Sequence, residues 1–181
     1  QEMIDTKVII CGICKDIESR LPYSIKIAEK IGRMFADYRI LMYENDSTDL
    51  TPTLLNEWMG KNENVRVKCE TTVGLKFVNE DYLKSSLTSR ARNKILDMLP
   101  EYSQEFEFVI WLDMDFVIEP LYSGFNEVFK RNGWDAVFAN GIDKVHGYWD
   151  WLAFRDNKNP LGPELLGHHN WYKQKDKLTL A

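Results

Sequence analysis

Cysteine and long apolar runs are both scarce in this chain of 181 residues. The three cysteines are an odd number, which predicts a chain that needs no disulfide framework and a reducing compartment. No apolar run approaches the roughly 20 residues of a membrane-spanning helix. We therefore expect a cytoplasmic protein. Because the chain begins at Gln1, the alternative is a Golgi lumenal protein whose upstream anchor was removed, and membrane contact is left open.

Positive charge is also in the minority. Lys and Arg total 23 against 28 Asp and Glu, for a net charge of −5. Nucleic-acid-binding domains usually carry a basic surface, so we expect no nucleic-acid partner. Apolar residues at 44% and aromatic residues at 13% are sufficient for a packed core. The length predicts a single domain over residues 1–181, either whole or one part of a longer protein.

Cys11 and Cys14 form a CxxC pattern, a spacing found in redox and zinc sites. The sequence holds no second CxxC, and this pair lies within the apolar segment "VIICGIC". We therefore interpret the two cysteines as buried reduced thiols in preference to a metal or redox site.

Short β-branched apolar segments alternate with segments of helical periodicity along the chain. Strands are predicted at 7–13, 38–44, 65–69, 107–113, 135–141 and 148–155. Helices are predicted at 16–37, where Pro22 lies in the first turn or marks the real start, and at 86–99 and 123–132. A further helix is predicted from Thr51 as cap with Pro52 first, and a long loop over 70–86. This alternation predicts an α/β fold with a mainly parallel, Rossmann-like sheet and helices on both faces.

Polar side chains follow three of the predicted strands, in "CGICKD", "ENDSTD" and "DMD". Ligands of open parallel sheets bind outside the carboxyl ends of the strands, where these three segments converge. Asp113 and Asp115 supply hard oxygen ligands suited to Mg²⁺ or Mn²⁺, which are usually shared with substrate phosphates. The sequence therefore predicts a divalent cation site at this edge.

Further residues suit an anionic nucleotide ligand. Arg90 and Arg92 in "TSRARNK" are capable of bidentate phosphate contact. Glu44 and Asp46, after the second strand, can accept hydrogen bonds from ribose hydroxyls or a base. The cations and carboxylates together favour a diphosphate site.

The ordered motifs "ENDSTD", "SRARNKIL", "FVIWLDMDFVIEP" and "YWDWLAFRD" resemble those of GT-A nucleotide-sugar glycosyltransferases, especially fungal mannosyltransferases of the mannan-polymerase and cryptococcal capsule families. The resemblance spans residues 7–156. It implies a GT-A fold and transfer of a sugar from a UDP- or GDP-linked donor to a glycan or glycoprotein acceptor. It also implies Mn²⁺ or Mg²⁺ as cofactor.

The resemblance also implies roles for individual residues. Asp113 would contact the ribose or the metal, and Asp115 would ligate the metal. Residues of the SRARN segment would face the diphosphate or sugar, and other strand-end residues would line the nucleoside pocket. The first group is Arg90, Arg92 and Asn93; the second is Gly12, Ile13, Glu44 and Asp46.

Later positions are candidates for the acceptor side. Asp150 or Glu164 would serve as the carboxylate base of an inverting enzyme, which a retaining enzyme does not need in the same place. A downstream histidine is a further metal ligand in many GT-A enzymes; His168 is the candidate here, with His146 and His169 as alternatives.

Two other functions compete with this hypothesis. The "LDMDFV" segment also fits haloacid-dehalogenase-type phosphatases, in which Asp113 would be the phosphorylated nucleophile and Asp115 an acid or base. However, that motif normally opens its chain. A nucleotide- or sugar-binding domain with an incomplete active site is the second alternative.

Overall fold

The structure is a computed structural model that describes residues 3–72, 80–116, 120, 122–131, 133–137, 142–143 and 147–148. For residues 80–86, 142–143 and 147–148 only the backbone is described. The chain divides into two units, Gln1–Asn132 and Gly133–Ala181. The prediction of a single domain stays a prediction.

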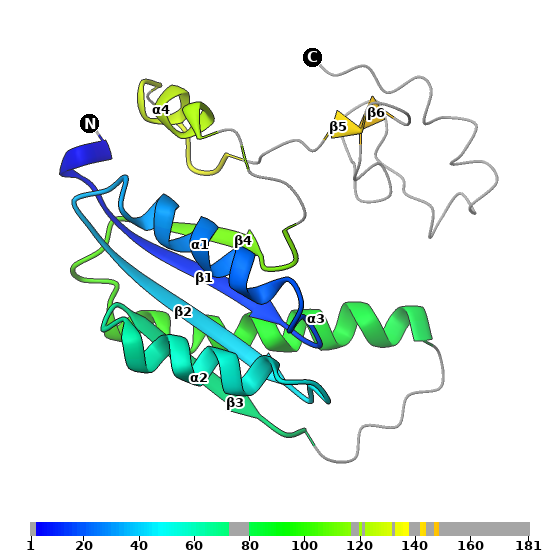
Figure 1. Ribbon diagram of the computed structural model, residues 1–181. Coiled ribbons are helices and arrows are strands. Elements are labelled where there is room, and N and C mark those ends of the chain that lie inside the picture. Colours follow the sequence, from blue (N-terminus) through cyan, green and yellow to red (C-terminus); the bar gives the residue numbers. More distant parts are fainter. Residues whose placement is uncertain are drawn as a thin grey trace. The chain divides into compact units, whose positions relative to one another are not determined.

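The first unit is built on a four-stranded, all-parallel sheet (Figure 1). Its strands are β1 (Lys7–Cys14), β2 (Asp37–Asn45), β3 (Val65–Glu70) and β4 (Phe108–Asp113), in the order β3-β2-β1-β4. The register places Ile13 between Tyr43 and Asp113, so the strands end at the same edge. The predicted parallel α/β fold is confirmed.

Helices cover both faces of this sheet. One face packs against α1 (Leu21–Gly32), α2 (Thr51–Lys61) and α4 (Ser123–Phe129), and the other packs against α3 (Glu80–Leu96) (Figure 1). Two short 3₁₀ turns, Met3–Asp5 and Leu99–Glu101, precede β1 and β4. No helix among the described residues is long and apolar enough to cross a membrane.

The core lies in two layers, because successive residues of a strand point to opposite faces. Ile10 and Met42 belong to the α1–α2 side, whereas Ile9 and Leu41 belong to the α3 side, and all four are 0–1% exposed. Each such side chain contributes about 1.5–3 kcal/mol when it leaves water. Burial on both faces therefore explains why β1 and β2 read as continuous apolar runs.

The structure corrects several predicted boundaries. The first helix begins at Leu21 with Pro22 in its first turn, as the predicted alternative start had it, and not at residue 16. The backbone N–H groups of residues 16–18 bond instead to side chains of the loop after β2 and of Thr51. Thr51 is the first residue of α2, not its cap; its Oγ1 accepts a hydrogen bond from the Ile17 backbone N–H at 2.9 Å. The third helix begins at Glu80, inside the predicted loop, and α4 ends at Phe129.

The second unit differs from the prediction where it is described. Residues 135–137 are not in a strand, although a strand was predicted over 135–141, whose remaining residues lie outside the described part. Two short strands, β5 (Ile142–Asp143) and β6 (Gly147–Tyr148), pair antiparallel. The rest of the predicted strand at 148–155 lies outside the described residues.

Candidate functional site

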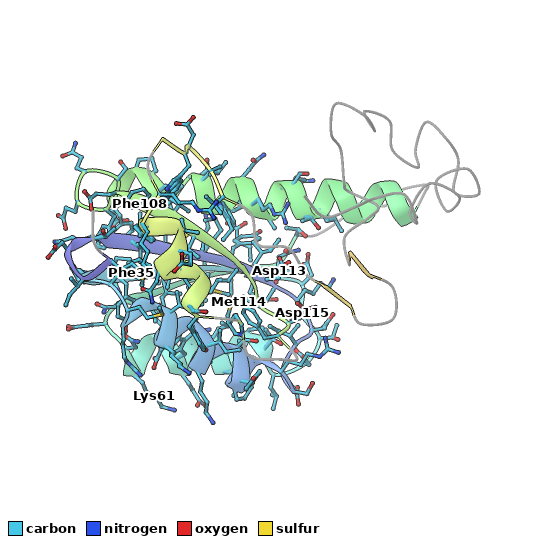
Figure 2. All side chains as sticks on the ribbon, turned by 90° about the horizontal axis from the view of Figure 1, so that it is seen from above. Phe35, Lys61, Phe108, Asp113, Met114 and Asp115 are labelled. Carbon is cyan, nitrogen blue, oxygen red and sulfur yellow. The ribbon has the colours of Figure 1, made fainter. Side chains whose placement is uncertain are left out.

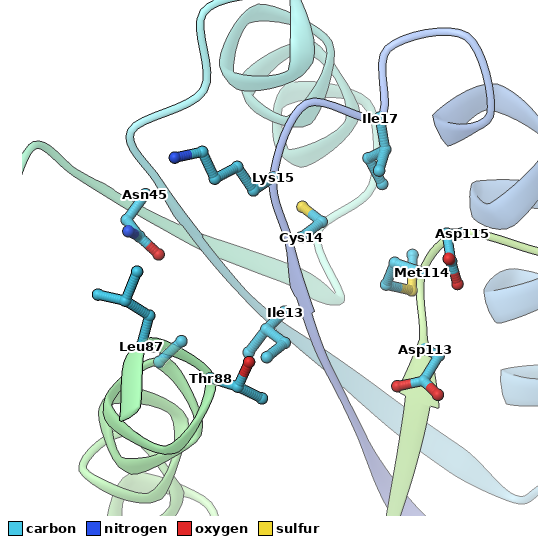
Figure 3. A pocket seen from close by; sticks show the side chains of 11 residues that line it. Ile13, Cys14, Lys15, Ile17, Asn45, Leu87, Thr88, Asp113, Met114 and Asp115 are labelled. Atoms are coloured by element: carbon cyan, nitrogen blue, oxygen red, sulfur yellow. The ribbon is translucent and has the colours of Figure 1, made fainter. Parts of the chain in front are cut away.

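A cavity of about 380 Å³ opens at the carboxyl edge of the parallel sheet (Figure 3). Its walls come from the end of β1 and the loop after it, from the end of β2, from α3 and from the DMD segment. The lining residues are Ile13, Cys14, Lys15, Ile17, Asn45, Leu87, Thr88, Ala91, Asp113, Met114 and Asp115. The volume lies in the range of small-molecule sites. Ile13, Asp113 and Asp115 were predicted as site residues, and the structure brings them together here.

The DMD segment is held in place through its central residue. The Met114 side chain is 2% exposed and packs over Gly12 in the core between the sheet and α1. The backbone carbonyl oxygen of Met114 accepts a hydrogen bond of 2.7 Å from the buried Ser24 hydroxyl. Figure 2 shows Asp113, Met114 and Asp115 together at one end of the sheet. Because Met114 is buried, Asp113 and Asp115 are left exposed at the cavity.

Gly12 is needed beneath this methionine. A Cβ atom at position 12 would lie 2.7 Å from Met114 Cγ and 2.9 Å from Met42 Sδ. Both distances are shorter than real Cβ contacts allow. The glycine is therefore explained by packing inside β1, and the nucleotide contact predicted for it stays a prediction.

The two aspartates differ in their partners. The Asp113 carboxylate has no hydrogen bond or ion pair with any described residue. Asp115 Oδ2 lies 3.7 Å from Arg20 Nη1, and both side chains are more than half exposed, at 62% and 52%. Lys15 also lines the cavity, and its side chain extends away from the two aspartates (Figure 3). The site thus combines two accessible carboxylates with one cation that pairs with Asp115 and a second cation elsewhere in the lining.

These carboxylates fit a Mg²⁺ or Mn²⁺ ion that is shared with a ligand. The described residues contain no group of three or more His, Cys, Asp or Glu side chains that could hold a metal. Magnesium, however, is commonly bound by one or two carboxylates together with substrate phosphates. Asp113 and Asp115 would hold the ion from the protein side. The carbonyl of Met114 is already engaged by Ser24.

Two loops beside the cavity are joined by reciprocal hydrogen bonds. We call residues 15–20, after β1, and 46–50, after β2, the interlocked loops. Backbone N–H groups of each loop donate to side-chain oxygens of the other. The pairs are Asp16 N to Ser47 Oγ (3.0 Å), Glu18 N to Asp49 Oδ2 (2.9 Å), Thr48 N to Asp16 Oδ1 (2.7 Å) and Leu50 N to Glu18 Oε2 (2.7 Å). These bonds fix the loop that carries Lys15 and Arg20.

Glu44 and Asp46 do not line the cavity. Glu44 is 2% exposed, and its Oε1 accepts a hydrogen bond of 2.8 Å from the Ser47 backbone N–H. Asp46 has a φ of 56° and accepts hydrogen bonds from the Thr72 side chain and backbone. The Thr72 hydroxyl is the main cause that lowers the pKa of Asp46, and the charge of Lys15 adds to it. Their predicted nucleoside contacts stay predictions.

The cationic segment of α3 also stands apart from the cavity wall. Arg90, Arg92 and Asn93 are exposed, whereas Leu87, Thr88 and Ala91 line the cavity. The arginines' predicted contact with a diphosphate therefore stays a prediction.

The next cation on α3 has a structural partner. Lys94 Nζ lies 3.0 Å from Glu70, which also pairs with Lys68 at 3.0 Å and accepts a hydrogen bond of 2.9 Å from the Tyr43 hydroxyl. The hydrogen bonds from Lys68, Lys94 and Tyr43, in that order, lower the pKa of Glu70 to about 2. This network ties α3 to the edge of the sheet.

The CxxC pattern is not a shared site. Cys11 packs on the α3 side of β1 and Cys14 on the α1 side, and both are free thiols. Burial raises the pKa of each thiol to about 12. Neither thiol is poised to act as a nucleophile, which agrees with the interpretation of the two cysteines as reduced structural residues.

The remaining predicted site residues lie outside the described part of the chain. They are Asp150, Glu164 and His168, together with the alternatives His146 and His169.

Sequence reasoning missed several residues that the structure places in or beside the cavity, among them the polar or charged Lys15, Arg20, Asn45 and Thr88. A signal existed for Lys15 and Asn45, since each adjoins the carboxyl end of a predicted strand. The α3 periodicity of Leu87, Ala91 and Ile95 also indicated which face meets the sheet. The pairing of Arg20 with Asp115 has no local signal.

Comparison of the sequence with protein-family models finds no matching family, and comparison with curated proteins finds no match either.

Proposed function

We propose that this chain is a metal-dependent glycosyltransferase that moves a sugar from a nucleoside-diphosphate sugar to a hydroxyl acceptor. The observation that carries the proposal is the position of Asp113 and Asp115 at the mouth of a cavity, at the carboxyl edge of a parallel sheet. Sheets of this kind bind their ligands at that edge. Two exposed carboxylates there favour a divalent cation and, with it, a diphosphate.

The described residues support a division of labour. Asp113 and Asp115 hold the cation, which when bound would neutralise charge developing on the leaving diphosphate. Arg20 supplies positive charge beside Asp115, and Lys15 adds a cation elsewhere in the cavity lining. The apolar wall of Ile13 and Leu87 suits the less polar part of a nucleoside. The donor is UDP- or GDP-linked and the acceptor is a glycan or glycoprotein.

Binding tests this proposal first. Thermal melting is measured with UDP-, GDP- and dTDP-sugars, each with and without Mn²⁺. A ligand that binds the native state raises Tm, and we expect one nucleotide series to do so only with the metal. Asp115→Ala should abolish the metal-dependent shift. Asp97→Asn is the matched control, because Asp97 is exposed and follows α3 at the opposite edge of the sheet. A full shift in Asp115→Ala, or no shift with any nucleotide, would refute the assignment.

Turnover separates the alternatives. A transferase that binds its donor should hydrolyse it slowly without an acceptor, whereas an incomplete binding domain should not. Release of phosphate from p-nitrophenyl phosphate, abolished by Asp113→Asn, would instead support the phosphatase.

A further inference from the structure

Arg20 is the cation that pairs with a proposed metal ligand in the described part of the chain. It directly precedes α1, and its Nη1 lies 3.7 Å from Asp115 Oδ2. Among the described residues, only Arg20 offers Asp115 a side-chain partner. Arg90 and Arg92, which the sequence favoured for phosphate contact, have no such link to the aspartates.

The backbone of Arg20 is fixed while its side chain is weakly held. Its carbonyl oxygen accepts hydrogen bonds from the N–H groups of Tyr23 at 3.0 Å and Ser24 at 3.1 Å, and its own N–H donates to the Ile17 carbonyl at 2.9 Å. The Arg20 side chain is 52% exposed, and an exposed ion pair of this length contributes little to stability. The guanidinium can therefore leave Asp115 at small cost.

Electrostatic repulsion predicts when the Arg20 guanidinium leaves Asp115. A divalent cation ligated by Asp115 repels a guanidinium that occupies the same carboxylate. The diphosphate that accompanies the cation offers this guanidinium a new anionic partner. Arginine suits that partner, because its planar fork can contact two phosphate oxygens at once.

We propose that Arg20 and the divalent cation compete for Asp115, and that the displaced Arg20 guanidinium binds the diphosphate of the donor. The proposal rests on the proposed function and deepens it. Arg20 thus holds Asp115 at the cavity before the ligand arrives, and becomes a ligand-binding residue afterwards.

Titration calorimetry with MnCl₂ alone tests the competition. Arg20→Gln should bind Mn²⁺ about 2- to 5-fold more tightly than the wild-type chain, because the competing cation is gone, a change typical of exposed ion pairs. Arg20→Lys keeps the charge and should resemble the wild type. Arg33→Gln is the matched control and should leave Mn²⁺ affinity unchanged, since Arg33 is 66% exposed, follows the other end of α1 and pairs with Glu29.

Titration with UDP and GDP at saturating Mn²⁺ tests the second half. Arg20→Gln should lose about 10-fold or more in affinity for the nucleotide that the wild type binds. Arg20→Lys should fall between the two, because lysine lacks the bidentate fork. Arg33→Gln should bind as the wild type does. Circular dichroism checks that each variant is folded.

The outcomes separate the two proposals. If Arg20→Gln binds Mn²⁺ no more tightly than the wild type, or keeps full nucleotide affinity, the role of Arg20 is overturned and the proposed function is not. If the wild type with Mn²⁺ binds neither UDP nor GDP, the proposed function and the diphosphate role both fall, while tighter Mn²⁺ binding by Arg20→Gln would still support the competition. If no variant binds Mn²⁺, both proposals are overturned.

Discussion

Replacement of Gly12 by alanine should weaken the fold through Met114. The new Cβ would lie 2.7 Å from Met114 Cγ and 2.9 Å from Met42 Sδ, so both side chains must move. Overpacking of this kind costs about 1–3 kcal/mol. Alanine recovers about 0.4–1 kcal/mol by restricting the unfolded chain. The net loss is therefore about 1–2 kcal/mol, which corresponds to a fall in Tm of roughly 3–6 °C for a chain of this size.

Urea unfolding measures this loss, and two further variants isolate its cause. Gly60→Ala is the matched control, because a Cβ at the exposed Gly60 of α2 meets nothing within 4 Å. That variant should gain about 0.5–1 kcal/mol. In a Met114→Ala background, Gly12→Ala should cost much less, since the main clashing side chain is absent. The two changes should therefore couple by about 1 kcal/mol.

The packing argument fails if Gly12→Ala is as stable as the wild type. It also fails if Gly12→Ala costs the same with and without Met114, because the loss would then arise elsewhere in β1. Mn²⁺ affinity of the folded Gly12→Ala chain gives an independent measure, since displacement of Met114 should move Asp113 and Asp115 and weaken binding.

Three further predictions concern other parts of the first unit. Ser24→Ala should lower the free energy of unfolding in urea by about 1–3 kcal/mol, because it leaves the Met114 carbonyl buried and unpaired. Ser103→Ala, at an exposed position, should lower it by under about 0.5 kcal/mol. Equal losses would contradict this. Because the pKa of Glu70 is lowered to about 2 in the folded chain, the charged carboxylate stabilises the fold fully above pH about 4.5 and progressively less as pH falls toward about 2. The Tm difference between the wild type and Glu70→Gln should therefore shrink over that range. A difference that stays constant would refute this. In the native chain, Ellman's reagent should label the exposed Cys69 in a fast phase and the buried Cys11 only on unfolding. Cys69→Ser should remove the fast phase. A fast phase that persists in this variant would show that another thiol is accessible.

Much of the sheet was predictable because its strands carry their own signal. Residues 7–14 and 37–45 are buried on both faces, so each gives a continuous apolar run that ends in polar residues. The start of α1 was not predictable in this way. Residues 16–18 satisfy their backbone N–H groups with side chains about thirty positions away, and no local pattern records that.

The site was predictable to a similar degree. Asp113 and Asp115 stand out because charged residues rarely interrupt so apolar a run. Their placement depends on Gly12 and Ser24, which lie about ninety or more positions earlier in the chain. The arginines of α3 attracted attention by charge alone, although Ala91, between them, shows which face meets the sheet.

Aromatic packing at the far edge follows the same rule of distant partners. Phe129 of α4 lies 5.5 Å from the Phe35 ring and 5.3 Å from the Phe108 ring, centroid to centroid. Figure 2 labels Phe35 and Phe108 at the end of the sheet opposite Asp113. No local pattern in the sequence indicates which rings Phe129 meets.

The interlocked loops have a consequence for how this protein can change. Surface loops usually tolerate insertions and deletions independently of one another. Here, an added residue at Glu18 would shift both the N–H that donates to Asp49 and the carboxylate that accepts from Leu50. Neither loop can therefore alter its length alone. A chimera designed to bind a different ligand at this edge should therefore exchange residues 15–20 and 46–50 at the same time.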